Sequence, residues 1–219
     1  MITVSMITMN EEAAVGLVID KIKRVVPDAE ILIVDSSSDR TPDIAAQRGA
    51  RVFRQFPPRG YGPAMELALR SAGGDVIVTM DCDDTYPTDQ IPVLAGYILQ
   101  DGYDVVDGSR LGSKPKAMPM INYLANAGFA LVASALFLRR FTDLHSGMRA
   151  YRKSVIDALP FDARGAALPV DLLLVPFKRG YKIKLTRIDY FERVGKSTMR
   201  PIESAWWTVR RIVATRFAR

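Results

Sequence analysis

Two carboxylates placed one residue apart, Asp81 and Asp83, carry the clearest chemical signal in this sequence of 219 residues. They follow an apolar, β-like run at 75–80, and a turn at that point projects both side chains toward one side. Carboxylate oxygens suit Mg²⁺ or Mn²⁺, which proteins commonly hold through one or two carboxylates plus the phosphates of a substrate. The pair predicts a divalent-metal site for a phosphorylated ligand, with helix capping by the neighbouring residues as the alternative.

Short polar segments follow three further β-like runs. They are Thr8-Met9-Asn10-Glu11, Asp35-Ser36-Ser37-Ser38 and Asp107-Gly108-Ser109-Arg110. The Asp35 carboxylate is placed to accept hydrogen bonds from a base or a ribose, and capping of the following turn is the alternative. Gly62 belongs to the segment Arg59-Gly60-Tyr61-Gly62 at the start of an expected helix, where backbone amides favour a phosphate. A simple loop explains this segment nearly as well.

The elements that must position these residues alternate between strands and helices. Strands are expected at 2–8, 31–34, 51–54, 75–80 and 103–106, and helices at 11–25, 41–48, 61–72 and 88–99. This rhythm predicts an α/β fold: a doubly wound, Rossmann-like, mainly parallel sheet with helices on both faces. Ligands of such sheets bind beyond the carboxyl ends of the strands, where the polar segments lie. Because no linker is visible, we expect a single domain over residues 1–219.

The second half of the sequence is less regular. Its expected elements are an apolar helix at 117–138, a polar loop at 143–147, a strand at 148–151, a helix at 170–178 and a strand at 182–188. The apolar helix is close to the ~20 residues that span a membrane. Pro119, Asn122 and Asn126 disfavour spanning, so a buried or membrane-interface helix is the preferred interpretation.

Positive charge is concentrated at the end of the chain. The net charge is +6, and residues 193–219 carry seven Lys/Arg against one acidic residue, which accounts for the whole excess. The expected helix at 201–219 combines Trp206, Trp207 and Phe217 with arginines, which suits an interfacial position on anionic lipid. Packing onto the core or onto a subunit is the alternative. Nucleic acid is not an expected partner, because no nucleic-acid-reading motif accompanies the basic segment.

Five motifs occur in the order that a known family shows. They are Ile7-Thr8-Met9-Asn10-Glu11, Asp35, Asp81-Cys82-Asp83, Ser146-Gly147-Met148-Arg149-Ala150-Tyr151-Arg152 preceded by Asp143, and Arg193-Val194-Gly195-Lys196-Ser197. On these motifs the sequence resembles the inverting family-2 glycosyltransferases of GT-A fold, in particular the dolichol-phosphate mannose synthases and polyprenyl-phosphate glycosyltransferases. The resemblance spans residues 2–199. It implies transfer of a sugar from a UDP- or GDP-linked donor to a polyprenyl phosphate.

The motifs and the resemblance together predict a role for each site residue. The nucleotide-sugar-binding residues are predicted to be Thr8, Glu11, Asp35, Ser37, Gly62 and Asp81. Asp81 and Asp83 are expected to bind Mg²⁺ or Mn²⁺, and the predicted catalytic residues are Asp83, Asp143 and Arg149. The acceptor phosphate is expected to contact Arg110, Asn122, Arg193, Lys196 and Ser197, since arginines bind phosphate oxygens bidentately.

The sequence also departs from the family pattern in three places. Ile7 and Met9 replace the usual Pro and Tyr, and serines follow Asp35 where Asp-Gly-Ser is usual. Asn122 stands where the apolar helix usually carries a Ser. These departures leave the identity of the base and of the acceptor open, and no motif in the sequence identifies the sugar.

Three hypotheses follow for the function. The favoured one is a membrane-associated transferase, because a lipid phosphate is already ionised and needs alignment and charge stabilisation more than a base. A soluble family-2 transferase acting on a hydroxyl needs a general base, for which Asp143 is the first candidate and His145 a weaker one. The third is a non-catalytic nucleotide-sugar-binding module.

The expected location is the cytoplasm, peripheral on the cytoplasmic face of a membrane. The single cysteine, Cys82, excludes an intramolecular disulfide and is compatible with a reducing compartment. The oligomeric state is left open.

Overall fold

A seven-stranded sheet forms the centre of the structure, a computed structural model that describes residues 1–112, 114–165, 167–195 and 201–218. The strands of this described part are β1 (Ile2–Thr8), β2 (Glu30–Asp35), β3 (Arg51–Arg54), β4 (Val76–Thr79), β5 (Val105–Ser109), β6 (Arg149–Arg152) and β7 (Ile183–Arg187). Their order is β3-β2-β1-β4-β6-β5-β7. Only β6 among them runs antiparallel to its neighbours, β4 and β5. The sheet is therefore mainly parallel, as the sequence predicts.

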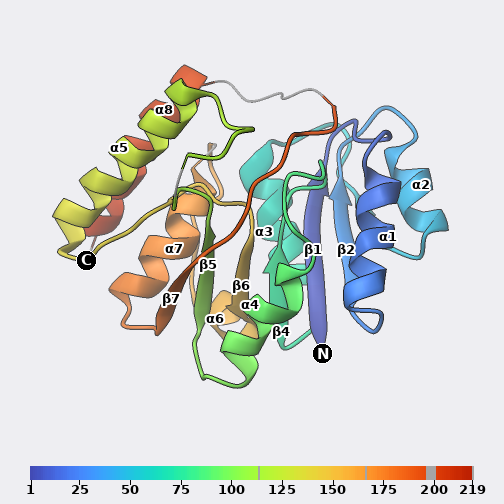
Figure 1. Ribbon diagram of the computed structural model, residues 1–219, viewed down its shortest axis with the longest axis horizontal. Coiled ribbons are helices and arrows are strands. Elements are labelled where there is room, and N and C mark those ends of the chain that lie inside the picture. The colour runs from blue at the N-terminus through green and yellow to red at the C-terminus, as the bar shows by residue number, and fades with distance from the viewer. Residues whose placement is uncertain (113, 166, 196–200, 219) are drawn as a thin grey trace.

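Helices cover both faces of the sheet (Figure 1). They are α1 (Val15–Val25), α2 (Thr41–Gln47), α3 (Tyr61–Ser71), α4 (Gln90–Leu99), α5 (Met120–Phe137), α6 (Lys153–Ala158), α7 (Leu168–Lys178) and α8 (Pro201–Phe217). The core on one face is formed with α1, α2 and α4, and the cores on the other face with α3, α6 and α7. In α1, apolar residues recur at helical spacing and are all buried, namely Val15, Val18, Ile19 and Ile22.

The structure changes several of the expected boundaries. Strand β5 continues to Ser109, so Asp107 is inside a strand rather than in the loop that follows it. Helix α1 begins at Val15 and not at residue 11. The short helix α6, between β6 and α7, was not expected. The antiparallel direction of β6 has no signature in its four residues, because direction depends on which distant strands a segment pairs with.

Helix α5 lies on the surface rather than in the core. Only 11% of its 18 residues are buried, which makes the buried alternative wrong. Ala130 and Ala133 are its buried residues, and its small inward side chains let the helix approach the structure beneath it. By length and composition alone it is long and apolar enough to cross a membrane, the one such helix in the described part of the chain.

Helix α8 packs against α5 and α7, and the inward side of the helix is partly charged (Figure 1). Arg211 is buried and donates to the Asp171 carboxylate over 2.9 Å, and Thr215 donates to the other oxygen of Asp171 over 3.1 Å. Arg216 donates to the carbonyl of Leu136 at the end of α5. The expectation that the arginines of this helix face lipid together is therefore wrong for Arg211, which attaches the helix to α7.

Candidate active site

A buried carboxylate lies where β1 and β2 end. Asp35 accepts a hydrogen bond from the Thr8 hydroxyl at 2.7 Å and two from Ser37, from its hydroxyl at 2.6 Å and its backbone N–H at 3.0 Å. Arg54, at the end of β3, forms an ion pair with the same carboxylate. Parallel pairing of β1 with β2 places Thr8 directly opposite Asp35. The structure thus brings together three of the residues predicted to bind the nucleotide and adds Arg54, which no sequence motif indicated.

The acidic motif lies at the end of β4, beside the end of β1. Asp83 is buried, and its Oδ1 accepts hydrogen bonds from the hydroxyl (2.6 Å) and backbone N–H (3.2 Å) of Thr85. Its Oδ2 lies 3.0 Å from Nη1 of Arg193. Arg193 also pairs with Glu11, a residue 182 positions earlier in the chain. The arginine predicted to contact the acceptor phosphate therefore lies at the predicted donor carboxylates.

The carboxylates of this edge perturb one another. Burial, reinforced by the nearby Asp83 charge, raises the pKa of Asp81 to about 6, although Arg110 and Arg193 oppose the shift. Burial likewise raises the pKa of Glu11 to about 7, where Arg193 lowers it and the Asp83 and Asp81 charges raise it. Asp83 and Glu11 thus share one arginine, Arg193, and the Asp81 carboxylate lies close enough to feel their charges.

The oxygen-only donor set of Asp81 and Asp83 fits a hard divalent cation. Within the residues that the structure describes, no three His, Cys, Asp or Glu side chains are grouped so that they could hold a metal ion by themselves. A site with one or two carboxylates that is completed by substrate phosphates is the usual arrangement for Mg²⁺. The residues present are compatible with such a shared site.

Gly147 of the later motif packs against the Asp81 side chain. A Cβ atom built on Gly147 would lie 2.9 Å from both carboxylate oxygens of Asp81, so a side chain there would displace them. The Gly147 N–H donates to the Tyr86 hydroxyl over 2.7 Å, and the Tyr86 ring meets the Tyr190 ring edge to face. Tyr86 is a site residue that the sequence reasoning missed, because a single aromatic after an acidic motif has no distinctive pattern.

Arg110 and Asp143 form a bidentate ion pair inside the molecule. Arg110 Nε lies 2.7 Å from Asp143 Oδ2, and Nη2 lies 3.1 Å from Oδ1. The backbone N–H groups of Arg110 and His145 donate to the same carboxylate. Burial by itself would raise the pKa of Asp143, but Arg110 and these hydrogen bonds hold it down at about 2. Asp143 therefore fixes the orientation of Arg110.

Arg149, a predicted catalytic residue, is fully buried. Its Nε donates to Asp107 Oδ1 over 2.5 Å, and its other nitrogens donate to the carbonyls of Pro169 and Asp143. Burial raises the pKa of Asp107 to about 6 despite this arginine. The structure thus places Arg149 in an internal ion pair with Asp107, and its catalytic role stays a prediction.

The remaining predicted residues lie in different surroundings. Gly62 is buried, and a Cβ atom there would lie 1.8 Å from the carbonyl oxygen of Ala163, so the backbone of another loop packs on it. Asn122 is half-buried near the start of α5. Lys196 and Ser197 lie outside the described residues.

His145 links the polar loop to the outer helices. Its Nε2 lies 2.8 Å from the Thr208 hydroxyl of α8, which itself donates to the carbonyl of Ser204. Thr208 must then accept from the ring, so the proton is on Nε2 of a neutral imidazole. Burial lowers the pKa of His145 to about 4. His145 therefore joins the loop to α8 through a hydrogen bond.

Comparison with known proteins identifies the class of protein. The family model "Glycosyl transferase family 2" matches residues 3–159, and the chain belongs to this family. The predicted GT-A fold is confirmed by solved structures of glucosyl-3-phosphoglycerate synthase from Mycobacterium tuberculosis. One of them, in complex with Mn²⁺, UDP and glucosyl-3-phosphoglycerate, has a TM-score of 0.74 and 26% identity, covering 98% of this chain and 77% of that chain.

Two relatives carry names that state transfer of a sugar to a lipid phosphate. A dolichyl-phosphate hexose transferase of Haloferax volcanii is 41% identical over 201 residues, which cover 91% of this chain and 87% of the relative. An undecaprenyl-phosphate mannosyltransferase of Micrococcus luteus is 30% identical over 210 residues, covering 88% of this chain and 84% of the relative. The fold, the site and the family together define a glycosyltransferase.

Proposed function

We propose that this glycosyltransferase moves a hexose from a nucleotide-diphosphate sugar to a polyprenyl phosphate at a membrane surface. An oxygen of the acceptor phosphate forms a bond with the anomeric carbon, while the bond from that carbon to the donor diphosphate breaks. The nucleoside diphosphate leaves with the electron pair, and the configuration inverts. The observation that carries the proposal is the group of carboxylates at the strand ends where ligands of such sheets bind: Asp83 and Glu11 pair with Arg193, and Asp81 lies near them.

The donor half of the proposal rests on charge. Asp81 and Asp83 would hold Mg²⁺ or Mn²⁺ together with the donor diphosphate, and the cation would neutralise the leaving group. Solved complexes of the Mycobacterium tuberculosis enzyme contain Mn²⁺ with UDP or UDP-glucose, which supports a UDP-linked donor here. Thr8, Asp35 and Ser37 are the residues that would hold the nucleoside.

The acceptor half rests on the state of Asp143. Both of its oxygens are occupied by Arg110 and backbone N–H groups, and its pKa of about 2 makes it a weak proton acceptor. A hydroxyl acceptor requires a base, whereas a phosphate is already ionised near neutral pH. The ion pair therefore argues against Asp143 as the base that a hydroxyl acceptor would need, whereas a phosphate acceptor needs none.

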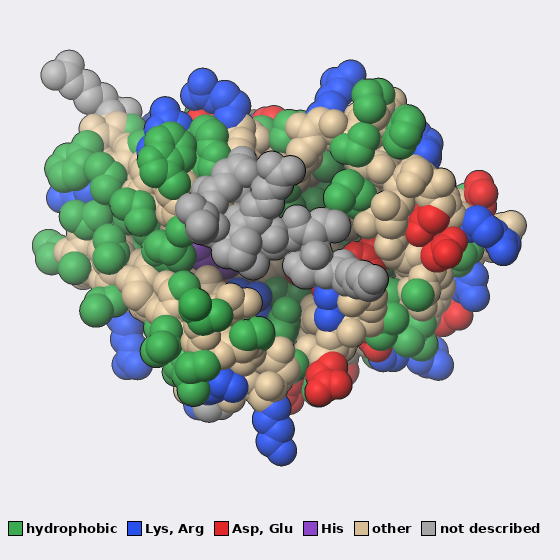
Figure 2. Space-filling view, turned by 90° about the horizontal axis from the view of Figure 1, so that it is seen from above, with side chains coloured by type: hydrophobic (Ala, Val, Ile, Leu, Met, Phe, Trp, Pro, Cys, Tyr) green, Lys and Arg blue, Asp and Glu red, His purple; other side chains and the backbone are tan. Residues whose placement is uncertain are grey.

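The membrane contact rests on the outer helices. Hydrophobic side chains gather over α5 and α8 in Figure 2. The exposed apolar residues of these helices and of Leu138, which follows α5, are Met120, Ile121, Leu124, Leu131, Val132, Leu138, Trp206, Val209, Val213 and Phe217. Arg210 stacks on Trp206 and Trp207 at this surface, which suits anionic headgroups. We infer that this apolar surface contacts the cytoplasmic leaflet.

The test is a donor screen with purified protein. UDP- and GDP-sugars are supplied with Mg²⁺ or Mn²⁺, with and without polyprenyl phosphate, and the sugar-lipid product is measured directly. We expect product with lipid phosphate and a loss of activity on chelation. Donor turnover that no lipid phosphate increases would overturn the proposal in favour of a hydroxyl acceptor. The absence of turnover with every donor would leave a sugar-nucleotide-binding module.

A matched pair of variants tests the metal-binding aspartates. Asp83→Asn should lower kcat about a thousandfold or more, because the carboxylate charge at the diphosphate is lost. Asp84→Asn is the control, since Asp84 faces α1 and pairs with Lys21 at 2.6 Å. Equal effects of the two substitutions would argue against a site on Asp83.

A further inference from the structure

The carboxylate of Asp35 is already occupied by contacts within the chain. Its Oδ1 accepts from the hydroxyls of Thr8 and Ser37, and its Oδ2 accepts from the backbone N–H of Ser37 and from Nη1 of Arg54. A carboxylate has about four lone-pair positions, so these bonds use all of them. The side chain is also fully buried. A nucleoside can therefore donate to Asp35 only if one of these bonds is first broken.

The two hydroxyls beside Asp35 are used as well. Ser37 donates to Asp35 over 2.6 Å and accepts from the N–H of Asn10 over 2.8 Å. The hydroxyl proton of Thr8 is donated to Asp35 over 2.7 Å. The polar side chains expected at the nucleoside thus satisfy one another, and a hydrogen bond donated to the base must come from a different group.

Arg54 is the neighbouring side chain that keeps donors for a ligand. It lies beside Asp35 in the register of β2 and β3, as Thr8 does on the β1 side. One terminal nitrogen donates to Asp35, and the other donates to the carbonyl of Ser37 over 2.9 Å. A guanidinium carries more N–H groups than these two bonds use. Because 44% of the side chain is exposed, the remaining donors are accessible.

The surroundings of Arg54 suit a planar ligand. Both terminal nitrogens are anchored, which fixes the plane of the guanidinium before a ligand arrives. The ring of Phe56 lies with its centroid 5.9 Å from Cζ of Arg54, and this residue is 60% exposed. Bases stack on aromatic rings of this kind. A face for stacking and fixed N–H donors for an edge therefore occur together at the end of β3.

We propose that Arg54 selects the base of the donor by donating to a keto oxygen, O4 of uracil or O6 of guanine. At the same position cytosine and adenine carry an amino group, which is itself a donor. An amino group facing Arg54 would leave two opposed donors without an acceptor, and a site built for a hydrogen bond rejects such an analogue. The inference rests on the proposed function and adds to it the residue that restricts the donor to keto bases. Asp35 and Ser37 then act on the nucleoside by orienting Arg54.

Two matched pairs of nucleotides test the proposal, UDP against CDP and IDP against ADP. In each pair a keto group and the neighbouring ring N–H are replaced by an amino group and a ring nitrogen. Titration calorimetry of the full chain with Mn²⁺ measures the Kd of each nucleotide. We expect the wild-type protein to bind the keto member of at least one pair about tenfold more tightly or better, because a charged hydrogen bond is lost with the amino member.

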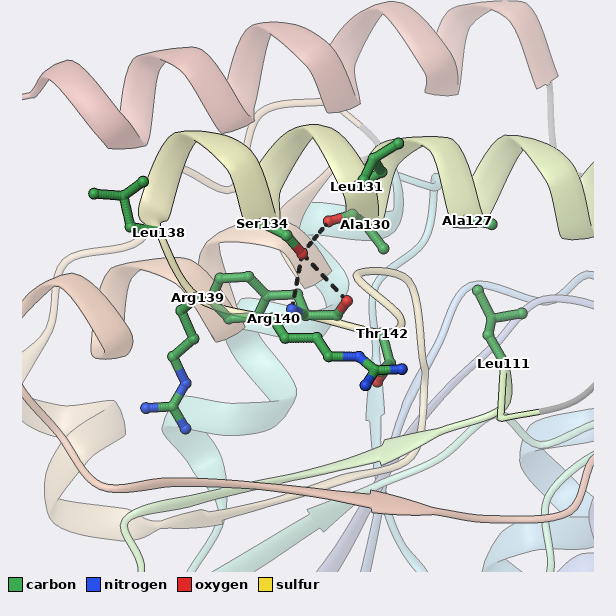
Figure 3. A pocket seen from close by; sticks show the side chains of 10 residues that line it. Leu111, Ala127, Ala130, Leu131, Ser134, Leu138, Arg139, Arg140 and Thr142 are labelled. Atoms are coloured by element: carbon green, nitrogen blue, oxygen red, sulfur yellow. Dashed lines mark hydrogen bonds between the residues drawn. The ribbon is translucent and has the colours of Figure 1, made fainter.

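Three variants separate selection of the base from a structural role. Arg54→Gln should remove most of the preference, since a glutamine amide both donates and accepts, whereas Arg54→Lys keeps a charged donor and should retain it. Arg140→Gln is the control and should leave every Kd unchanged. Arg140 is an exposed arginine that lines a groove of about 510 Å³ beneath α5 (Figure 3), and α5 and β2 lie on opposite sides of the molecule (Figure 1).

The preference is a ratio of two Kd values measured on one variant, so a partial loss of folded protein does not alter it. If Arg54→Gln weakens both members of a pair equally and the ratio stays at its wild-type value, Arg54 only supports the loop and the inference is overturned. A wild-type protein that binds keto and amino members equally would overturn it too. Failure of all four nucleotides to bind the wild-type protein would instead count against the donor half of the proposed function.

Discussion

The strand ends that form the site (the site edge) and the outer helices α5 and α8 differ in what they bury. The site edge buries charged side chains in pairs, whereas the outer helices expose apolar side chains. At the site edge, arginines are matched to carboxylates inside the chain: Arg110 to Asp143, Arg149 to Asp107, and Arg193 to Asp83 and Glu11. On α5 and α8, apolar side chains face outward, and Arg210 stacks on the rings of Trp206 and Trp207. The site edge is thus built to keep its geometry in a buried, charged interior. The exposed apolar side chains of the outer helices suit contact with a membrane.

The largest expected effect breaks the buried pair behind the site. Arg149→Met leaves the Asp107 carboxylate buried without a cation, and should lower the free energy of unfolding by about 3–5 kcal/mol. The double variant Arg149→Met/Asp107→Leu should recover much of this loss, because two apolar groups replace two charges. Urea unfolding of both variants measures the difference. If the double variant is as unstable as the single one, the loss does not come from an unpaired Asp107 charge, and this explanation is contradicted.

The next effect tests whether α8 is attached by its charged inward side. Arg211→Met should destabilise the protein by roughly 2–4 kcal/mol, since Asp171 loses its buried partner at 2.9 Å. Arg210→Met, one residue earlier on the exposed side, should change stability by no more than about 0.5 kcal/mol. Thermal and urea unfolding compare the two. A similar loss of stability in both variants would contradict the view that Arg211, but not Arg210, attaches α8 to the core.

The third prediction concerns the outward side of the same helix. Trp206 and Phe217 are 60% and 68% exposed, so Trp206→Ser/Phe217→Ser should leave folding stability nearly unchanged. Binding to anionic phospholipid vesicles should weaken roughly tenfold, because apolar area no longer enters the interface. Vesicle co-sedimentation at low and high salt gives the measurement. Undiminished binding would place the membrane contact elsewhere on the molecule.

The smallest effect lies at the junction of the two regions, at His145. The folded pKa of this histidine is about 4, below the ordinary value of 6.5, so protons bind preferentially to the unfolded chain as pH falls. Stability contributed by the neutral ring is present above pH 6.5 and is lost progressively toward pH 4. Compared with His145→Gln, the wild-type protein should lose on the order of 1 kcal/mol between pH 7 and pH 5. If the difference in unfolding free energy between the wild-type protein and His145→Gln is the same at pH 7 and pH 5, this coupling is contradicted.

Much of the donor site was predictable because its residues follow strands. The apolar runs that end at Thr8, Asp35 and Thr79 are local patterns, and parallel strands bring their carboxyl ends to one edge. The acidic motif and the segments after β1 and β2 were therefore expected together and lie together. Arg54 and Tyr86 were missed, because each becomes a site residue only through contact with a segment far away in sequence.

The sequence by itself determined the α/β rhythm, the family and the strand ends that carry the acidic motif, since these depend on local periodicity and on contiguous motifs. Only the tertiary structure decided which cation meets which anion. In the folded chain Arg149 pairs with Asp107, and Asp143 pairs with Arg110. Arg193 pairs with Glu11 and Asp83. The tertiary structure also placed α5 on the surface over a groove. These outcomes depend on burial and on pairing between distant segments, which set the energy of a charge more strongly than its neighbours in sequence do.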